Sequence, residues 1–267
     1  MRITFLGTGH ATVTRCYNTC FLLKDAGFSL LVDGGGGSTL LSRLQSTGTK
    51  VSDLHDIFVT HRHIDHILGI VWLLRLLCHE KAKGTAQGEY RIYGHKEVTD
   101  LLALLAEKLL EPKEARHIGE SIRLIRVEDG EERRIGNRDA VFFDVGSLKA
   151  RQFGFSLNYA DGKTLACLGD EPCHPCAEPY VKGCTWLLHE AFCLEQDAAL
   201  FHPYEKQHST VRDACLLAER LSIPNLILYH TEDSDLARRK ERYLAEGRRF
   251  YSGRLFVPDD LEAIDLD

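Results

Sequence analysis

The sequence predicts an α/β fold with a metal-binding site at the ends of its β-strands. Short apolar segments rich in β-branched and aromatic residues alternate with segments of helical periodicity along most of the chain. One such apolar segment, residues 57–59, is followed directly by four potential metal ligands, and later strands also end in carboxylates or histidines. These ligands are His61, His63, Asp65 and His66.

The composition is that of an ordinary globular protein. A length of 267 residues, with 44% hydrophobic and 27% charged residues, fits a single domain over 1–267. The net charge of −6 gives no overall preference for polyanions. The first residues lack the apolar core of a signal peptide, and no apolar stretch is long enough to span a membrane. With nine cysteines and no secretion signal, we expect reduced thiols, a cytoplasmic location and no membrane partner.

The first half of the chain is predicted to contain several strands and three helices. Gly7-Thr8-Gly9 ends the first strand, and the glycines of 34–37 precede the first helix. No Lys-Ser/Thr pair follows these glycines, so we expect them to allow close backbone packing rather than to bind phosphate. The predicted strands are 2–6, 21–23, 29–32, 57–59 and 90–93, and the predicted helices are 38–47, one from Asp65 or His66 onward, and 96–110.

The second half is predicted to be mainly β-structure followed by two helices. A polar turn at 128–139 separates two strands, and a turn at 160–163 closes a hairpin. No repeat, low-complexity segment or linker interrupts the chain. The predicted strands are 122–127, 140–145, 153–159, 164–168, 186–191 and 226–229, and the predicted helices are 210–221 and 238–246.

The pattern His61-x-His63-x-Asp65-His66 lies at a predicted strand-to-helix turn, where side chains can converge on one point. Histidine is the commonest metal ligand, and a neighbouring carboxylate suits zinc or another borderline divalent ion. The alternative is a polar turn with surface histidines. The close spacing favours a metal site.

This pattern resembles the signature of the metallo-β-lactamase superfamily. The resemblance implies a four-layer αβ/βα sandwich with two mixed β-sheets flanked by helices. Later motifs are similar to those of the ribonuclease Z branch, and the similarity runs from Met1 to about Tyr243. These motifs are Gly169-Asp170, His189-Glu190-Ala191-Phe192, His208-Ser209-Thr210 and Tyr229-His230-Thr231.

The resemblance implies a role for each site residue. His61 and His63 would hold a first metal, and Asp65, His66 and His230 a second, with Asp170 bridging the two and Asp33 orienting the loop. Asp65, Glu190 and His208 are the candidate catalytic residues, the last two handling protons at the leaving group. The expected cofactor is Zn²⁺, one or two ions per chain, with Mn²⁺ as an alternative. Relatives usually form homodimers, so we expect one here.

Two departures from the family pattern affect this interpretation. A further metal-binding histidine is expected near Gly146, but no histidine lies between His117 and His174. We therefore expect the firmest metal at Asp65, His66, Asp170 and His230. The interval from Ser147 to Asp170 is also too short for the long arm with which tRNA-processing members grip tRNA.

The leading hypothesis is a metal-dependent phosphodiesterase that cleaves RNA 3′ ends, as in tRNA processing, or small cyclic phosphodiesters. A lactone, thioester or β-lactam hydrolase on the same metal core is one alternative. A degenerate protein that binds metal or nucleotide without turnover is another. Cys173-His174-Pro175-Cys176 is a weaker candidate for half of a structural zinc site, and Ser209 is expected to cap the helix after it.

Overall fold

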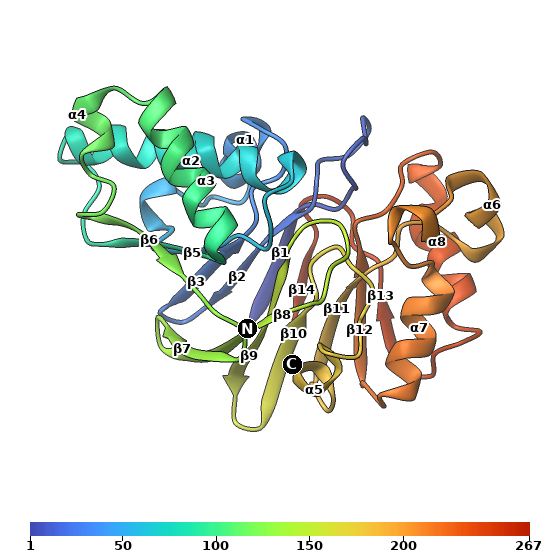
Figure 1. The fold of residues 1–267 in the computed structure, drawn as a ribbon. Helices are drawn as coiled ribbons and strands as arrows, with labels where there is room; N and C mark the ends of the chain where they lie inside the picture. The colour runs from blue at the N-terminus through green and yellow to red at the C-terminus, as the bar shows by residue number, and fades with distance from the viewer.

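Two mixed β-sheets of seven strands each lie face to face between two layers of helices in the computed structural model, which describes residues 1–267 (Figure 1). The predicted four-layer sandwich is thus confirmed. In spatial order the first sheet contains β14 (Ala263–Asp265), β1 (Arg2–Gly7), β2 (Cys20–Asp25), β3 (Phe28–Val32), β4 (Asp56–Phe58), β5 (Tyr90–Gly94) and β6 (Ile122–Arg126). The second contains β13 (Arg254–Phe256), β12 (Asn225–Tyr229), β11 (Trp186–Glu190), β10 (Lys163–Cys167), β9 (Phe153–Ala160), β8 (Arg138–Asp144) and β7 (Glu131–Ile135).

The helices divide between the outer faces of the two sheets (Figure 1). The first sheet is covered by α1 (Thr39–Ser46), α2 (Ile64–Ala82), α3 (Lys96–Leu109) and α4 (Pro112–Ala115). The second is accompanied by α5 (Glu178–Val181), α6 (Ala198–Phe201), α7 (Val211–Arg220) and α8 (Leu236–Gly247). Short 3₁₀ turns lie at Val51–Asp53, Glu195–Asp197 and Tyr204–Lys206. None of the helices combines the length and apolar character needed to cross a bilayer.

Three apolar cores hold the four layers together. Along β3, Leu30 and Val32 face the core between the sheets, whereas Leu31 faces the core under α1–α3. This alternation follows from the two-residue period of a strand, which sends successive side chains to opposite faces. Both faces of each sheet are therefore apolar, as expected for a sheet buried between layers.

The site is positioned by parallel strands that all end on one edge. In the first sheet β3, β4, β5 and β6 are parallel, and in the second β10, β11, β12 and β13 are parallel. Ligands of α/β proteins bind at the carboxyl ends of such strands. The segments that carry the candidate site residues leave β3, β4, β10, β11 and β12 at this edge.

Close backbone packing supports the metal-binding turn. A Cβ atom on Gly69 of α2 would lie 1.8 Å from the carbonyl oxygen of Gly34, and a Cβ on Gly34 would lie 2.5 Å from the amide nitrogen of Ile70. Only glycine fits at either position, because any side chain would collide with backbone. The predicted packing role of the glycine run after β3 is confirmed at Gly34.

Several sequence-based element predictions were wrong in detail. The segment 128–139 is not only a turn, because β7 lies within it and pairs with β8. The short elements α4, α5, α6, β13 and β14 were not predicted. The cap of α7 is Thr210 rather than Ser209: its hydroxyl accepts from the amide of Asp213, whose carboxylate accepts in turn from the amide of Thr210. Such a capping box satisfies amide groups that a helix start leaves free.

Candidate metal centre

The histidine motif is divided by the start of α2. His63 precedes the first residue of the helix in an extended conformation, with φ −65° and ψ 151°. His61 and His63 therefore project from the loop after β4, whereas Asp65 and His66 belong to the first helical turn. This change of backbone direction lets residues close in sequence approach one point from two directions.

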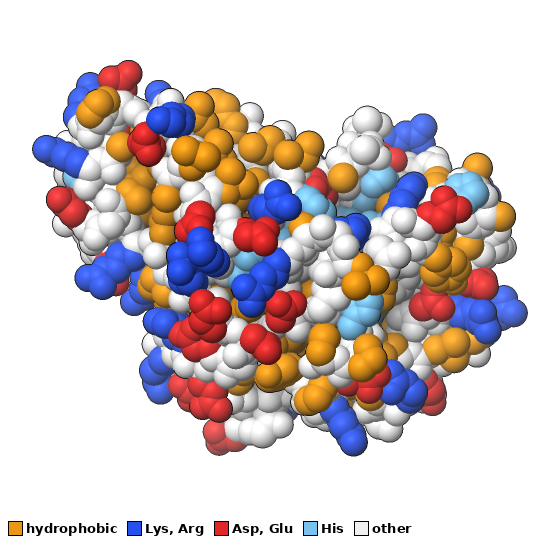
Figure 2. Space-filling model, viewed as in Figure 1, with side chains coloured by type: hydrophobic (Ala, Val, Ile, Leu, Met, Phe, Trp, Pro, Cys, Tyr) orange, Lys and Arg blue, Asp and Glu red, His pale blue; other side chains and the backbone are white.

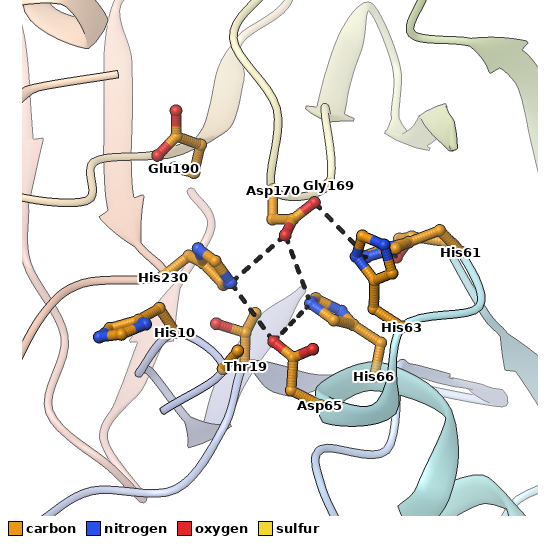
Figure 3. Close-up of polar contacts among 12 residues, drawn as sticks. His10, Thr19, His61, His63, Asp65, His66, Gly169, Asp170, Glu190 and His230 are labelled. Carbon is orange, nitrogen blue, oxygen red and sulfur yellow. Dashed lines mark hydrogen bonds and ion pairs between the residues drawn. The ribbon is translucent and has the colours of Figure 1, made fainter. Parts of the chain in front are cut away.

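One group of ligand atoms comes from both sheets (Figure 3). Nε2 of His66 lies 3.4 Å from Oδ2 of Asp65 and 3.7 Å from Oδ2 of Asp170. Nε2 of His230 lies 3.7 Å and 3.4 Å from the same two oxygens. All four side chains are buried. We call Asp65, His66, Asp170 and His230 the second half-site.

Asp33 fixes the orientation of His66, one of the four residues of this half-site. Its Oδ2 accepts hydrogen bonds from Nδ1 of His66, at 2.7 Å, and from the hydroxyl of Thr60, at 2.8 Å, while Oδ1 accepts from the Thr60 amide. The Nδ1 proton of His66 is thereby occupied, and Nε2 is directed at the ligand cluster. Metal-binding histidines commonly have such a carboxylate partner.

Two of these residues have unusual backbone conformations. Asp33 and His230 have φ values of 57° and 56°, in the left-handed region that side-chain-bearing residues seldom occupy. Strained positions of this kind cluster at functional sites. Each residue directly follows a buried strand, so the left-handed turn sends its side chain toward the site.

His61 and His63 form a separate pair, which we call the first half-site. Nε2 of His61 lies 2.9 Å from Nδ1 of His63 and 3.7 Å from Oδ1 of Asp170. The two carboxylate oxygens of Asp170 thus face different half-sites. The side-chain amide of Gln152 contacts both His61 and Asp170.

The donor set of the second half-site fits a divalent metal ion. Nε2 of His66 and both ring nitrogens of His230 are buried without a hydrogen-bond partner. Buried polar atoms are seldom left unpaired, and one nitrogen of each of these rings is free to donate a lone pair to a metal ion. Two imidazoles and two carboxylates suit zinc or manganese. Three sets of buried ligand atoms converge closely enough to share an ion: His61, His66 and Asp170; Asp65, His66 and His230; and Asp170, His208 and His230.

The electrostatics of the cluster favour charged carboxylates. Burial by itself raises the pKa of Asp65 and of Asp170, but the neighbouring histidines more than offset it and hold both pKa values well below the ordinary range. For His61, burial is the dominant effect and lowers the pKa well below its ordinary value. Carboxylates that stay ionised and a histidine that stays neutral are the states in which these side chains bind metal.

Glu190 and His208 lie beside the second half-site as a buried pair. Oε2 of Glu190 is 3.7 Å from Nδ1 of His208, and neither atom has another partner. Burial raises the pKa of Glu190 well above its usual range, although its Oε1 accepts from the Ser209 amide. Burial lowers the pKa of His208 to about 3. In the resting protein the proton of this pair therefore belongs to Glu190.

The structure thus brings together all eight site residues predicted from the sequence, in two half-sites and a proton-handling pair. One weaker prediction, the structural zinc site, fails. Asp144 does not stand in for the missing histidine, because its carboxylate accepts hydrogen bonds from Gly146 and Arg151. The Cys173–Cys176 segment assembles no set of three ligand atoms.

Three residues near the site were not predicted. Gln152 carried no sequence signal, because a lone glutamine beside a strand has many possible roles. His10 packs near His230 with ring centroids 6.3 Å apart, and its place after Gly7-Thr8-Gly9 at a strand end was an available clue. Lys149 lies 3.2 Å from the buried carboxylate of Glu171, next to Asp170, and only the fold reveals that position.

Comparison with known proteins places the chain among metallo-hydrolases. A family model described as Anti-Pycsar protein Apyc1 matches residues 1–246. The ribonuclease Z of Metallosphaera sedula is 25% identical over 100% of this chain and 99% of its own length, and that of Haloferax volcanii is 27% identical over 100% and 95%. The similarity to ribonuclease Z predicted from the sequence is confirmed.

Solved structures share the fold at lower identity. The metallo-β-lactamase fold protein YhfI of Bacillus subtilis has a TM-score of 0.77 at 18% identity and covers 98% of both chains. The short form of human tRNase Z has a TM-score of 0.76 at 20% identity and covers 100% of both. A diphosphatase of the PhnP family has a TM-score of 0.75 at 17% identity, covering 100% of this chain and 98% of its own.

Proposed function

The chain belongs to the Anti-Pycsar protein Apyc1 family, and from the geometry of the site we propose that it hydrolyses small cyclic phosphodiesters such as cyclic nucleotides. It is a metal-dependent hydrolase of the phosphodiesterase type with a metallo-β-lactamase fold. The proposal concerns the substrate, the metal and the roles of individual residues. We also infer that residues 1–267 act as one hydrolase domain, because both halves of the chain supply site residues.

The observation that carries the proposal is the segment between Ser147 and Asp170. It contains the hairpin of β9 and β10, whose strands pair with β8 and β11 inside the second sheet. No part of it extends away from the sheet as an arm able to grip a folded RNA. A site without such an arm suits a substrate small enough to be held by the site itself.

The charges around the site suit a phosphodiester. The side chain of Lys149 is 27% exposed. Its ammonium group forms an ion pair with the carboxylate of Glu171, a side chain that is only 1% exposed. Together with burial, its charge contributes to the lowered pKa of His208 and of His63. Lys149 is therefore close enough to the metal ligands to attract an anionic phosphoryl group, even though the net charge of the protein is −6.

We propose Zn²⁺, with Mn²⁺ as the alternative, as the ion that Asp65, His66, Asp170 and His230 would hold. Such an ion polarises a phosphoryl oxygen and lowers the pKa of a water molecule. His208 would hold the leaving oxygen through its second ring nitrogen and protonate it as the bond to phosphorus breaks. Glu190 would donate its own proton to Nδ1, the nitrogen that its Oε2 faces, in the same step, so that the imidazole stays neutral and the negative charge is left on the Glu190 carboxylate.

A second candidate is cleavage of RNA 3′ ends. It is favoured by the curated relatives named ribonuclease Z, which match the chain over its whole length. The two candidates share one site and one chemistry, so they differ only in what the surface around the site accommodates.

The decisive experiment is a parallel assay of cyclic nucleotides, bis-p-nitrophenyl phosphate and a precursor tRNA with defined Zn²⁺ or Mn²⁺. We expect turnover of cyclic nucleotides that chelation abolishes, and no specific cleavage of the precursor tRNA. Cleavage of the tRNA without cyclic-nucleotide turnover would favour the second candidate. Turnover of lactones or thioesters alone, or phosphodiester turnover that survives Asp65→Ala, would refute the proposal.

We further propose that the protein forms a homodimer through an apolar surface on α2 and α3. Ile64, Leu68, Trp72 and Leu109 are exposed there, and Figure 2 shows apolar side chains gathered over these helices. Exposed apolar patches of this kind mark protein interfaces. Light scattering coupled to gel filtration should give a dimer for the wild type and a monomer for Trp72→Glu, with Leu200→Glu on α6 as the control. A wild-type monomer would refute this.

A further inference from the structure

The two half-sites differ in how their ligand atoms are satisfied. In the second half-site, Nε2 of His66 and both ring nitrogens of His230 are buried and unpaired. In the first, Nδ1 of His61 lies 3.1 Å from the amide nitrogen of Gln152, which can donate to it, and its Nε2 lies 2.9 Å from Nδ1 of His63. Both ring nitrogens of His61 therefore have partners within the protein.

The distance within the His61–His63 pair is that of a hydrogen bond. Two imidazole nitrogens bound to one tetrahedral zinc, each about 2.0–2.1 Å from the ion, lie ~3.3 Å apart. Nε2 of His61 and Nδ1 of His63 are only 2.9 Å apart. A shared proton explains this separation better than a shared ion.

Gln152 supplies the remaining contacts of the first half-site (its partners His61 and Asp170 are drawn in Figure 3). Its Nε2 donates to Oδ1 of Asp170, the oxygen that faces His61, and lies 3.1 Å from Nδ1 of His61. A carboxamide nitrogen has two protons, enough for both contacts. Its oxygen Oε1 is buried and has no hydrogen-bond partner. The orientation of the amide is therefore set only by the two contacts of its nitrogen.

The position near which the family resemblance implies a third histidine is unfavourable for any side chain. Gly146 has a φ of 77°, and a Cβ atom there would lie 2.6 Å from Sγ of Cys176. Cβ and Cγ of His174 would lie 3.5 Å and 3.8 Å from the same Cβ atom. The conformation of this loop thus depends on glycine at position 146.

We propose that Gln152 closes the first half-site with hydrogen bonds, so that the chain holds a single metal ion, at Asp65, His66, Asp170 and His230. The side-chain amide of Gln152 hydrogen-bonds to Oδ1 of Asp170, the oxygen that an ion bound by His61 and His63 would otherwise coordinate. This inference rests on the proposed metal-dependent function and adds the number of ions and the residue that sets it.

The test is a metal titration of chelator-stripped protein, with Zn²⁺ as the probe. Isothermal calorimetry and elemental analysis should give one equivalent for the wild type. Gln152→Glu, which has nearly the same shape but replaces the amide nitrogen by an oxygen ligand, should bind a second equivalent at least ~10-fold more tightly than the wild type. Gln152→His should do the same. The exposed Gln196→Glu is the matched control and should stay at one.

The outcomes separate the inference from the proposed function. Two equivalents in the wild type, with the second lost in Gln152→Ala, would overturn the inference and leave the function standing. No bound metal in the wild type would overturn both. Thermal unfolding of each stripped variant identifies any substitution that fails to fold, and the near-isosteric Gln152→Glu keeps the test available if Gln152→His does not fold.

Discussion

Nδ1 of His66 donates to Oδ2 of Asp33 at 2.7 Å, joining the end of β3 to the first turn of α2. The bond leaves Nε2 of His66 as its only atom free for a ligand. It also makes Asp33, which contacts none of the other candidate ligands, the residue that aims this histidine.

We expect Asp33→Asn to lower metal affinity by roughly 10–100-fold, the usual cost of losing an orienting carboxylate. Asparagine tolerates the left-handed backbone of this position, so the change tests the charge and hydrogen bonds rather than strain. Calorimetric titration with Zn²⁺ measures the effect, and Asp161→Asn in an exposed turn is the control. Unchanged affinity would show that the bond is only structural.

We expect His208→Asn to lower kcat on a phosphodiester by about 10²–10⁴-fold, the usual contribution of a positioned acid. Metal content should stay unchanged, because His208 is not a ligand of the proposed ion. His202→Asn is the control, since His202 is an exposed histidine whose left-handed φ of 51° asparagine also tolerates. A substrate with a good leaving group such as p-nitrophenolate should lose less activity than a cyclic nucleotide. Equal losses on both substrates would contradict the role in leaving-group protonation.

The pH dependence should have an alkaline limb set by Glu190. Burial raises its pKa well above the ordinary value of a glutamate, so the carboxyl keeps its proton at pH values where an ordinary glutamate is ionised. If that proton serves the leaving group, activity is present below the raised pKa and falls as pH rises through it. The profile of kcat/KM between about pH 5 and 9 should lose this limb in Glu190→Gln. An unchanged profile would assign the limb to another group.

We expect Phe58→Ala to destabilise the fold by about 3–5 kcal/mol. Phe58 is fully buried between the sheets, with its ring centroid 5.0 Å from that of Phe142 and 5.6 Å from that of Phe155. Denaturant unfolding of the stripped protein measures the change. Leu148→Ala, at a side chain 74% exposed, should cost far less. A loss for Phe58→Ala no larger than that of the control would show that this core can repack.

Local sequence patterns predicted most of the fold. Strands such as β1 and β12 and helices such as α3 were located within one or two residues, because apolar periodicity depends only on nearby residues. The strand β7 was missed because its sequence, Glu131–Ile135, is almost entirely charged and stands as a strand only through pairing with β8. The short β13 and β14 likewise depend on partners distant in sequence.

The site was predicted to a similar degree. Its histidines and carboxylates follow strand ends in a recognisable order, so the sequence identified the members of the cluster. It did not reveal Gln152 or Lys149, whose positions result from how residues 146–152 fold against β10 and the loop after it. It also could not show that the two half-sites differ in hydrogen bonding, since that depends on distances between side chains.

The second half-site takes Asp65 and His66 from the first half of the chain and Asp170 and His230 from the second. An ion held there is a cross-link between the two sheets, which also meet through apolar side chains and through the ion pair of Asp25 on β2 with Arg138 on β8. By analogy with a disulfide, such a link removes freedom from the unfolded chain most effectively when it closes a long loop. Metal binding in this protein therefore also holds its two sheets together. Removal of the metal by a chelator should make the sheets more mobile along the edge where substrate enters.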